Sequence, residues 1–346
     1  MASSSGVREG VLLGMGNPLL DISITGNQDL LSRYGLEPNN AVLATPEQHE
    51  LFHEVVEKFS PSYIAGGATQ NSVRVAQWLL QVPGATTFMG GVGNDRFRHI
   101  LEENARCVGV NVCYQVYPDD KTGVCAAIIT GEDRSLITEL GAAERFCLDF
   151  LQKQENWALV EKARYFYIGG FLLSNSSDVV TAVAKHCSAA KKTLVMNLHA
   201  TFLCQYFADP GLNLMPHVDV LFGNGDEYTE FARQMNMDMG DMAALALKVA
   251  ALPKANSDLP RIVIITQGKA PTIVATEGRV EEIHVQPVDT SLIKDTNGCG
   301  DAFVGGFLSQ LVQGKPLSEC LRCGSYAAKI VIQHFGCTYP DHPDFV

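Results

Sequence analysis

The sequence predicts an α/β protein: a three-layer α/β/α domain around a mostly parallel central sheet, with a small, discontinuous, β-rich lid domain. Short apolar runs rich in β-branched residues alternate along the chain with helix-like segments, as strands buried on both faces of a parallel sheet do. Two other segments break this alternation and resemble strands of a separate sheet. The 346 residues are 46% hydrophobic, so the chain can bury a large core.

Five apolar runs supply the strands expected in the main sheet. They are GVLLGMG near the start, YFYIGG at 165–170, TLVMNL at 193–198, VDVLFGN at 218–224 and RIVIITQG at 261–268. Ligands of such sheets bind at the carboxyl ends of the strands. Polar residues that follow the runs therefore become site candidates, among them Asn17, Asn197, Asn224 and Thr266.

The segments 21–38 and 111–140 break the alternation of strand and helix. The second shows alternating residues between turn signals at Pro118 and Gly131. We expect both in a small sheet that forms a lid over the carboxyl edge of the main sheet. The predicted organisation is a large catalytic and nucleotide-binding domain of 1–17, 65–110 and 141–346, with a lid of 18–64 and 111–140.

Helix signals are clear at three places. Thr45 is an N-cap candidate, with Pro at the next position and Gln three after the cap. Apolar residues recur at helical spacing over 69–81 and over 301–316. Gly305 and Gly306 lie inside the last segment, where each costs about 1 kcal/mol relative to Ala. Close helix packing is the reason we expect for them.

Charge and cysteine usage restrict the partners and the compartment. The net charge is −12 without a long basic run, which argues against nucleic acid or a membrane surface. No apolar run reaches the roughly 18 residues of a membrane span. MASSSGVREG lacks the apolar core of a secretory leader, so we expect a cytoplasmic protein with reduced thiols, the nucleus and other compartments left open. We also expect a monomer. For Cys320 and Cys323, two buried thiols on a helix face are favoured over a zinc or redox site.

The stretch KDTNGCGDAF, at 294–303, places two glycines and an acidic residue at the start of an apolar helix. The backbone amides of Gly298, Cys299 and Gly300 can converge there, and the helix dipole favours an anion at that point. Asp301 could then take a proton while the amides hold negative charge. The alternative is an ordinary glycine-rich turn, with Asp301 as a residue of the first helical turn.

Two stretches nearer the N-terminus offer groups for a hydroxylated ligand. In AGGATQNSVRVAQWL, Gly66 and Gly67 permit close backbone approach or a hinge, and Asn71 offers an amide in the first helical turn. In GNPLLDI, Asn17 and Asp21 follow the first strand, and the carboxylate could accept hydrogen bonds from two vicinal hydroxyls of a sugar. The alternatives are a common loop before a helix and ordinary Asn-Pro turn chemistry.

A fourth stretch, FGNGDEYTEF, carries Asn224 and Glu227 three residues apart, just past a strand. Oxygen ligands that act largely through water suit Mg²⁺. The alternative is a helix cap, because Asn at the N-cap with Glu three residues later also forms a capping box.

In this order and at this spacing, the four stretches resemble the ribokinase-like (PfkB-type) family of sugar and nucleoside kinases. A-G-G-x-x-x-N and D-T-x-G-x-G-D-A-F are its two signatures, and N-x-x-E is its metal motif. The resemblance covers essentially the whole chain and is closest to the branch that phosphorylates adenosine, which TGVCAAIITGEDRSL and GCTYPDHPDF also match. It implies a ribokinase-like fold, transfer of the γ-phosphoryl of ATP to the 5′-hydroxyl of adenosine in purine salvage, and Mg²⁺ as cofactor.

The resemblance also implies roles for individual residues. Asp301 would be the general base, the amides of Gly298, Cys299 and Gly300 the anion hole, and Arg134 a lid residue that neutralises phosphate. The implied substrate-binding residues are Asn17, Leu19, Asp21, Gly66, Gly67, Asn71, Cys125, Leu136, Phe171 and Asn297. The implied nucleotide contacts are Asn224, Thr266, Gly268, Gly298 and Gly300, and the implied metal site is Asn224 with Glu227.

Alternatives remain for part of this set. Arg134 could be a solvated residue at a hairpin end, and the apolar candidates could belong to the core, since an apolar side chain does not advertise exposure. Two positions depart from the family pattern. Cys299 replaces a small residue such as Ala, and Ser325 stands where some members carry a larger polar residue near the nucleotide.

The sequence leaves three other functions to compare with this one. For a kinase of the same fold acting on inosine or ribose, the apolar lid favours a purine over a free sugar, because burying unmatched polar groups is costly; a substrate panel decides between adenosine and inosine. A non-catalytic nucleotide-binding regulator is disfavoured because Asp301, Asn224, Glu227 and Arg134 are all retained. A Rossmann dehydrogenase is set aside, since GMGNPLLD lacks the third glycine of the dinucleotide fingerprint.

Overall fold

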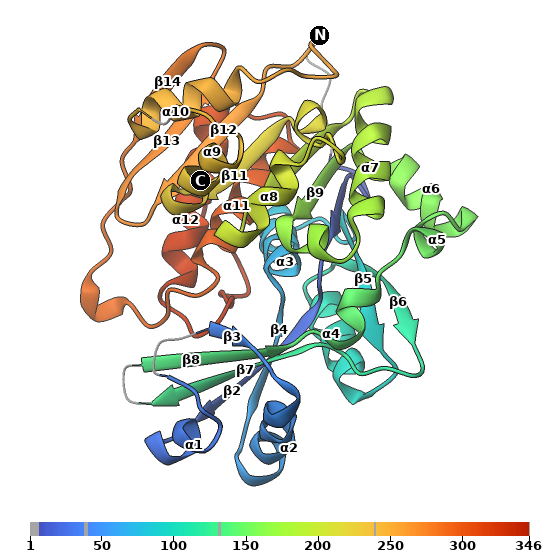
Figure 1. The fold of residues 1–346 in the computed structure, drawn as a ribbon, viewed down its shortest axis with the longest axis vertical. Coiled ribbons are helices and arrows are strands. Elements are labelled where there is room, and N and C mark those ends of the chain that lie inside the picture. The colour runs from blue at the N-terminus through green and yellow to red at the C-terminus, as the bar shows by residue number, and fades with distance from the viewer. Residues whose placement is uncertain (1–6, 38–40, 131–132, 239, 346) are drawn as a thin grey trace.

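The computed structural model describes residues 7–37, 41–130, 133–238 and 240–345, which form two separate β-sheets with their helices (Figure 1). The larger sheet has nine strands in the order β14-β13-β12-β11-β10-β9-β1-β5-β6. Their bounds are β1 Leu12–Met15, β5 Thr86–Gly93, β6 Asn111–Tyr117, β9 Tyr165–Gly169, β10 Thr193–Asn197, β11 Val220–Asn224, β12 Ile262–Gln267, β13 Ala270–Thr276 and β14 Arg279–Ile283. All neighbouring strands from β6 at one edge across to β12 are parallel. Strands β13 and β14 are added antiparallel at the opposite edge.

Helices cover both faces of the large sheet because its strands are apolar on both sides. Leu12 and Tyr167 pack with one helix layer, whereas Leu13 and Phe166 pack with the other, as alternation along a strand requires. The first layer holds α3 Ala68–Leu80, α4 Arg96–Cys107, α11 Cys299–Leu311 and α12 Leu317–Val331. The second holds α5 Leu148–Leu151, α6 Gln154–Lys162, α7 Ser177–Ala189, α8 Cys204–Ala208, α9 Gly225–Gln234 and α10 Met242–Ala250. The predicted three-layer α/β/α arrangement and all five predicted strands are confirmed.

The smaller sheet has the order β3-β8-β7-β2-β4. Its strands are β2 Leu19–Thr25, β3 Ala41–Leu43, β4 Ser62–Gly66, β7 Val124–Thr130 and β8 Asp133–Glu139. Helices α1 Gln28–Arg33 and α2 His49–Lys58 pack on one face of it, where Leu20, Ile22 and Ile24 are buried. In Figure 1 this sheet lies below the large sheet.

Two expectations about the small sheet are wrong. Strand β6 belongs to the large sheet, where it pairs in parallel with β5, so not all of 111–140 lies in the lid sheet. As an edge strand, β6 is only half buried. Its apolar and polar residues therefore alternate, as they would in a strand of a separate sheet. The segment 21–38 contains helix α1 after its single strand, because Asn27 caps a short helix by accepting a hydrogen bond from the Leu30 amide.

The predicted helices are present with small shifts of their ends. Helix α3 runs one residue earlier at each end than the predicted 69–81, α11 begins two residues before Asp301, and the predicted capping box at Thr45 precedes α2. A Cβ atom on Gly305 would lie 2.6 Å from the Ser72 carbonyl oxygen of α3, and one on Gly306 would lie 2.4 Å from the Cys323 carbonyl oxygen of α12. The two glycines therefore permit close packing of α11 against both helices, as predicted.

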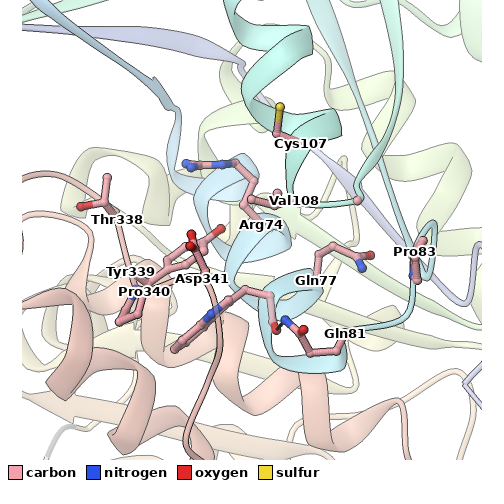
Figure 2. Close-up of a pocket in the computed structure, with 12 residues that line it drawn as sticks. Arg74, Gln77, Gln81, Pro83, Cys107, Val108, Thr338, Tyr339, Pro340 and Asp341 are labelled. Atoms are coloured by element: carbon pink, nitrogen blue, oxygen red, sulfur yellow. Dashed lines mark hydrogen bonds between the residues drawn. The ribbon is translucent and has the colours of Figure 1, made fainter.

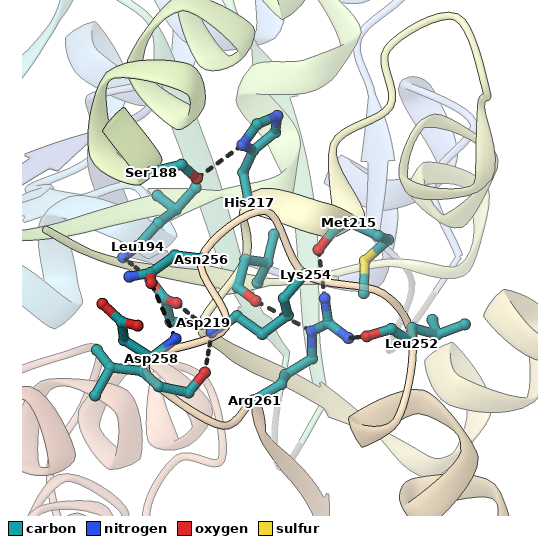
Figure 3. A network of polar contacts seen from close by, with 12 residues as sticks. Ser188, Leu194, Met215, His217, Asp219, Leu252, Lys254, Asn256, Asp258 and Arg261 are labelled. Carbon is teal, nitrogen blue, oxygen red and sulfur yellow. Dashed lines mark hydrogen bonds and ion pairs between the residues drawn. The ribbon is translucent and has the colours of Figure 1, made fainter. Parts of the chain in front are cut away.

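A buried polar network joins the amino ends of the central strands (Figure 3). Arg261, 1% exposed, donates to five backbone carbonyl oxygens, those of Met215, Val218, Val249, Leu252 and Pro253. Asp219 accepts from the Leu194 amide and from Lys254. Because this network lies at the start of β10, β11 and β12, we interpret it as structural.

Among the described residues, none of the helices is long and apolar enough to cross a membrane. Cys320 and Cys323 are both buried in α12.

Candidate active site

The candidate site lies where the chain crosses between the two sheets. The first crossing runs from the end of β1 at Met15 to the start of β2 at Leu19, and the return runs from the end of β4 at Gly66 into α3. Helix α11 packs against α3, so its first turn is brought to the same place. The predicted stretches around Asn17, Gly66 and Asp301, although far apart in sequence, therefore become neighbours.

Asn71 and Asp301 are in direct contact. The Nδ2 group of Asn71, in the first turn of α3, donates to Oδ2 of Asp301, in the first turn of α11, at 3.0 Å. Burial raises the pKa of Asp301 to about 7, although the hydrogen bond from Asn71 lowers it. A carboxyl with a pKa near neutrality can act as a proton acceptor at physiological pH.

The amides before Asp301 lie in a turn that only glycine adopts without strain. Gly298 has φ +76° and caps α11, and the first helical bond runs from the Ala302 amide to the Gly298 carbonyl at 2.8 Å. The amides of the first turn have no partner within the helix, and those of Gly298 and Gly300 can be offered to an anion. A Cβ atom at Gly300 would meet nothing within 4 Å, which leaves open space above this turn.

Cys299 is the member of the predicted anion hole whose groups are already engaged. Its amide donates to the Thr296 carbonyl at 3.4 Å, and its thiol donates to the Asp295 carbonyl at 3.8 Å. Burial raises the pKa of Cys299 to about 12, so the thiol is protonated. The geometry therefore gives no support to a reactive thiolate at this position.

Asp295 is a site residue that the sequence analysis missed. Its carboxylate is buried, and it accepts from the Asn297 amide at 3.0 Å and from the Gly336 amide at 2.7 Å. It thus fastens the loop before the glycines to the C-terminal segment, while Asn297 itself stays exposed. The available signal was its place as the first Asp of the glycine motif.

Asp21, Gly66, Gly67 and Asn17 form a second group of close contacts. A Cβ atom on Gly66 would lie 2.3 Å from the Asp21 carboxylate, and one on Gly67 would lie 2.3 Å from the Asn17 carbonyl oxygen. Gly67 also has φ +86°. Only glycine fits at either position, so the two glycines let the Asp21 carboxylate and the Asn17 backbone approach the start of α3.

Two buried amide oxygens in this region point to a hydroxylated ligand. Oδ1 of Asn17 and Oδ1 of Asn71 have no hydrogen-bond partner among the described residues. Buried acceptors of this kind are rare in folded proteins because leaving them unpaired costs free energy. Both oxygens are hydrogen-bond acceptors, and the O–H groups of a sugar can donate to them.

An aromatic group lies beside the carboxyl ends of β9 and β10. Phe171, 37% exposed, stacks on His199 with ring centroids 5.1 Å apart, and Phe202, 59% exposed, lies 6.3 Å from Phe171. The hydroxyl of Tyr167 is 3.3 Å from Nε2 of His199, and burial lowers the pKa of His199 to about 3, so the ring is neutral. Sequence analysis found only Phe171, because the others carry no motif.

The three lid candidates lie on one face of the small sheet. Cys125 is in register with Asp21, and Leu136 is in register with Ala127. Leu19, Cys125 and Leu136 are partly exposed, whereas Leu20, Val124 and Ile137 are buried on the face that carries α1 and α2. Arg134 is in β8, in register with Ile129, but its side chain lies outside the described residues.

Asn224 and Glu227 form the capping box that was the alternative reading. Asn224 donates to the Glu227 carboxylate from its backbone at 2.9 Å and from Nδ2 at 2.8 Å, and its Oδ1 accepts from the Glu227 amide at 2.9 Å. Burial raises the pKa of Glu227. Each carboxylate oxygen keeps lone pairs beyond these bonds, so the cap does not prevent a water-mediated contact with a cation.

The remaining nucleotide candidates lie near this cap. Thr266 is in register with Asn224, and its hydroxyl donates to the Gly223 carbonyl at 3.4 Å. Gly268 has φ +60° in the exposed turn between β12 and β13. Ser325 lies half-buried on α12.

In the described part of the chain, no three His, Cys, Asp or Glu side chains are grouped to hold a metal ion. One carboxylate with waters and phosphate oxygens is a coordination that fits Mg²⁺.

Comparison with known sequences agrees with this geometry. Residues 34–344 match the model of the pfkB family carbohydrate kinases. The chain is 46% identical to adenosine kinase 2 of Arabidopsis thaliana, with 100% of both proteins covered. It is 38% identical to the adenosine kinase of Schizosaccharomyces pombe over 95% of this chain and 96% of the relative.

Solved structures show the same fold. The adenosine kinase of Anopheles gambiae, in complex with P1,P4-di(adenosine-5) tetraphosphate, superposes with a TM-score of 0.90 at 44% identity, covering 98% of this chain and 100% of the other. The adenosine kinase of Schistosoma mansoni, in complex with adenosine, superposes with a TM-score of 0.87 at 31% identity, covering 96% and 98%.

Proposed function

The chain belongs to the pfkB family of carbohydrate kinases, and from this membership and the geometry of the site we propose that it is an ATP-dependent adenosine kinase. It transfers the γ-phosphoryl group of ATP to the 5′-hydroxyl of adenosine, giving AMP and ADP, a reaction of purine salvage. The observation that carries the assignment of the reacting groups is the contact between Asn71 and Asp301 beside the open glycine turn.

Asp301 accepts the proton of the 5′-hydroxyl as the oxygen attacks phosphorus. Phosphoryl transfer depends on positioning and on stabilisation of charge. The amides of the first turn of α11, at Gly298 and Gly300, supply that stabilisation together with the helix dipole. Asn71 orients the Asp301 carboxylate through its Nδ2 group and leaves its Oδ1 to accept a ribose hydroxyl.

The ribose is held by Asp21 and by the amide oxygens of Asn17 and Asn71. The carboxylate accepts hydrogen bonds from vicinal hydroxyls, and Gly66 and Gly67 leave room for the sugar to approach. The purine lies between the aromatic ring of Phe171 and the open face of the small sheet, which carries Leu19, Cys125 and Leu136. Apolar walls suit a purine, because a free sugar would leave polar groups unpaired there.

ATP binds on the side of the transferred phosphoryl group opposite the 5′-hydroxyl of adenosine. Thr266 and Gly268 contact its phosphates, and Arg134 neutralises their charge from the lid. Asn224 and Glu227 would hold Mg²⁺ largely through water, and the bound ion would supply positive charge for the phosphate oxygens. Closure of the small sheet over the strand ends keeps water from the phosphoryl group.

A coupled assay of ADP release over a panel of acceptors tests this proposal. We expect kcat/KM for adenosine to exceed that for inosine and for ribose by at least about tenfold, since a missing or unmatched polar contact costs about 1–3 kcal/mol. We also expect turnover to require Mg²⁺. A higher kcat/KM with ribose or inosine than with adenosine would rule the substrate assignment out, and binding of adenosine and ATP without turnover would favour a regulator.

A further inference from the structure

A cavity lies outside the proposed active site. Its volume is about 500 Å³, and it lies between α3, the end of α4 and the C-terminal segment 338–341 (Figure 2). Arg74, Gln77, Trp78 and Gln81 form its α3 wall, one helical stripe that begins a turn after Asn71. None of the residues assigned above to adenosine, ATP or Mg²⁺ lines it.

Arg74 is a buried cation at this cavity without an acidic partner. Its side chain is 5% exposed, and Nη1 donates to the Ala65 carbonyl at 2.7 Å. Nε is buried and has no hydrogen-bond partner, and no carboxylate among the described residues forms an ion pair with the guanidinium. A buried charge whose fork is half used is costly unless an anion completes it. The free Nε–Nη2 edge is the edge that binds a carboxylate with two parallel hydrogen bonds.

Two further donors at the cavity are unused. The indole nitrogen of Trp78, a residue 3% exposed, and the hydroxyl oxygen of Tyr339 are buried and have no partner among the described residues. The two rings stack with centroids 4.7 Å apart, and the Arg74 guanidinium carbon lies 5.8 Å from the Tyr339 centroid. Figure 2 shows Arg74 on α3 and Tyr339 on the C-terminal segment close to one another.

The other polar groups of the wall are already satisfied internally. Gln77 donates to the Val82 carbonyl and accepts from the Thr86 amide, and Gln81 donates to the Trp78 carbonyl. The buried polar groups of the cavity that lack a partner are therefore donors, one of them on a positively charged side chain, set among aromatic rings. It fits a ligand with acceptors, one negative charge and an apolar body.

We propose that this cavity binds a small aromatic carboxylate, whose carboxylate group takes the free edge of Arg74 and whose ring lies against Trp78 and Tyr339. A singly charged group is favoured over a doubly charged phosphate because Arg74 supplies one charge and Asp341 adds a negative charge at the exposed rim. The segment 338–341 moves to admit the ligand, since the unused atoms are buried in the free protein.

The two tryptophans of the chain, Trp78 and Trp157, provide a direct test. In full-length protein carrying Trp157→Phe, Trp78 is the sole tryptophan, and benzoate is titrated against its emission under selective excitation of tryptophan. We expect a saturable change with benzoate, at least tenfold weaker binding of the neutral isostere benzamide, and weaker binding of phenylphosphonate. The absence of a saturable change with benzoate overturns the site. If benzamide binds with the same affinity as benzoate, or if phenylphosphonate binds more tightly than benzoate, the assigned ligand class is overturned.

Two substitutions in the Trp157→Phe background locate the binding. Arg74→Gln is expected to abolish the preference for benzoate over benzamide. Tyr339→Phe keeps the ring and removes the hydroxyl, so benzoate should bind roughly three- to tenfold more weakly. Tyr326→Phe is the matched control, because Tyr326 also stacks near Trp78, at 6.2 Å, but its hydroxyl accepts from the Asp344 amide. Equal effects of the two Tyr→Phe changes would place the ligand elsewhere and overturn the proposal.

Discussion

The Nδ2 group of Asn71 donates a hydrogen bond to Oδ2 of Asp301 at 3.0 Å, although 230 positions separate the two residues. The bond joins the first turns of α3 and α11, and Gly305 lets those helices pack closely enough to form it. It fixes the proposed base beside the open glycine turn. Five expected outcomes follow from this arrangement and its surroundings.

Asp301→Asn should reduce kcat by at least about 10²–10⁴-fold, because a general base typically contributes that much. Adenosine should still bind, since Asn keeps the size of the side chain. Turnover is measured by ADP release and binding by calorimetry. Asp178→Asn, an exposed carboxylate in the first turn of α7, is the control and should behave as wild type. Near-normal turnover of Asp301→Asn would remove Asp301 from the role of base.

The pH profile of kcat/KM should have an acidic limb with a midpoint near the pKa of Asp301, which burial raises to about 7. Below that pH the carboxyl carries a proton and cannot accept another, so activity falls about tenfold per pH unit. The bond from Asn71 lowers this pKa. Asn71→Ala should therefore move the midpoint to higher pH, in addition to weakening adenosine binding.

The profile is measured from about pH 5 to pH 9 at saturating ATP. Asn104→Ala, which loses a side-chain bond to the Ile100 carbonyl in α4, serves as control and should leave the midpoint in place. An unchanged or lower midpoint in Asn71→Ala would contradict the assigned coupling.

Gly67→Ala should destabilise the protein by more than about 2 kcal/mol. The residue would be held at φ +86°, which alone costs about 1–2 kcal/mol, and its Cβ would lie 2.3 Å from the Asn17 carbonyl oxygen. Gly278→Ala is matched, with φ +71° but nothing within 4 Å of the added Cβ, so it should show only the conformational cost. Urea unfolding measures both, and equal losses would show that the Asn17 contact is unimportant.

Asp295→Asn should lower kcat more than it raises KM for adenosine. The carboxylate accepts from the Asn297 and Gly336 amides, and Asn turns one acceptor into a donor that faces an amide. The loop before the glycines then loses its anchor, at a cost of about 1.5–3 kcal/mol for a bond to a charged group. Asp289→Asn, whose carboxylate caps only the nearby Ser291, is the control. An increase in KM without a fall in kcat would be the wrong pattern.

Glu227→Gln should raise the Mg²⁺ concentration for half-maximal activity by about tenfold or more, as loss of a metal-binding contact does. Helix α9 should stay intact, because Gln also serves at the third position of a capping box. Mg²⁺ is titrated at fixed ATP, and circular dichroism follows the fold. Glu230→Gln, which pairs with Arg233 on the same helix, should leave the Mg²⁺ dependence unchanged. The same Mg²⁺ requirement in both variants would place the metal elsewhere.

Short sequence patterns predict much of the fold. The five apolar runs became strands because each is buried on both faces, and Gly305 and Gly306 mark the helix that packs most closely. Predictions from local sequence patterns were wrong where the solvent exposure of a segment decided its structure. The alternation in 111–117 belongs to a half-solvated edge strand of the large sheet, and Asn27 starts a helix where a strand was expected.

The site shows the same division. The sequence by itself determined the glycine turns, the acidic residue after them and the cap at Asn224, because these depend on neighbouring residues and on backbone conformation. Only the tertiary structure decided that Asn71 meets Asp301, that Asp21 packs against Gly66, that Asp295 reaches Gly336, and that Arg74 is buried without a carboxylate. These contacts join segments that fold against each other, and burial, which sets the pKa of Asp301, exists only once they have packed.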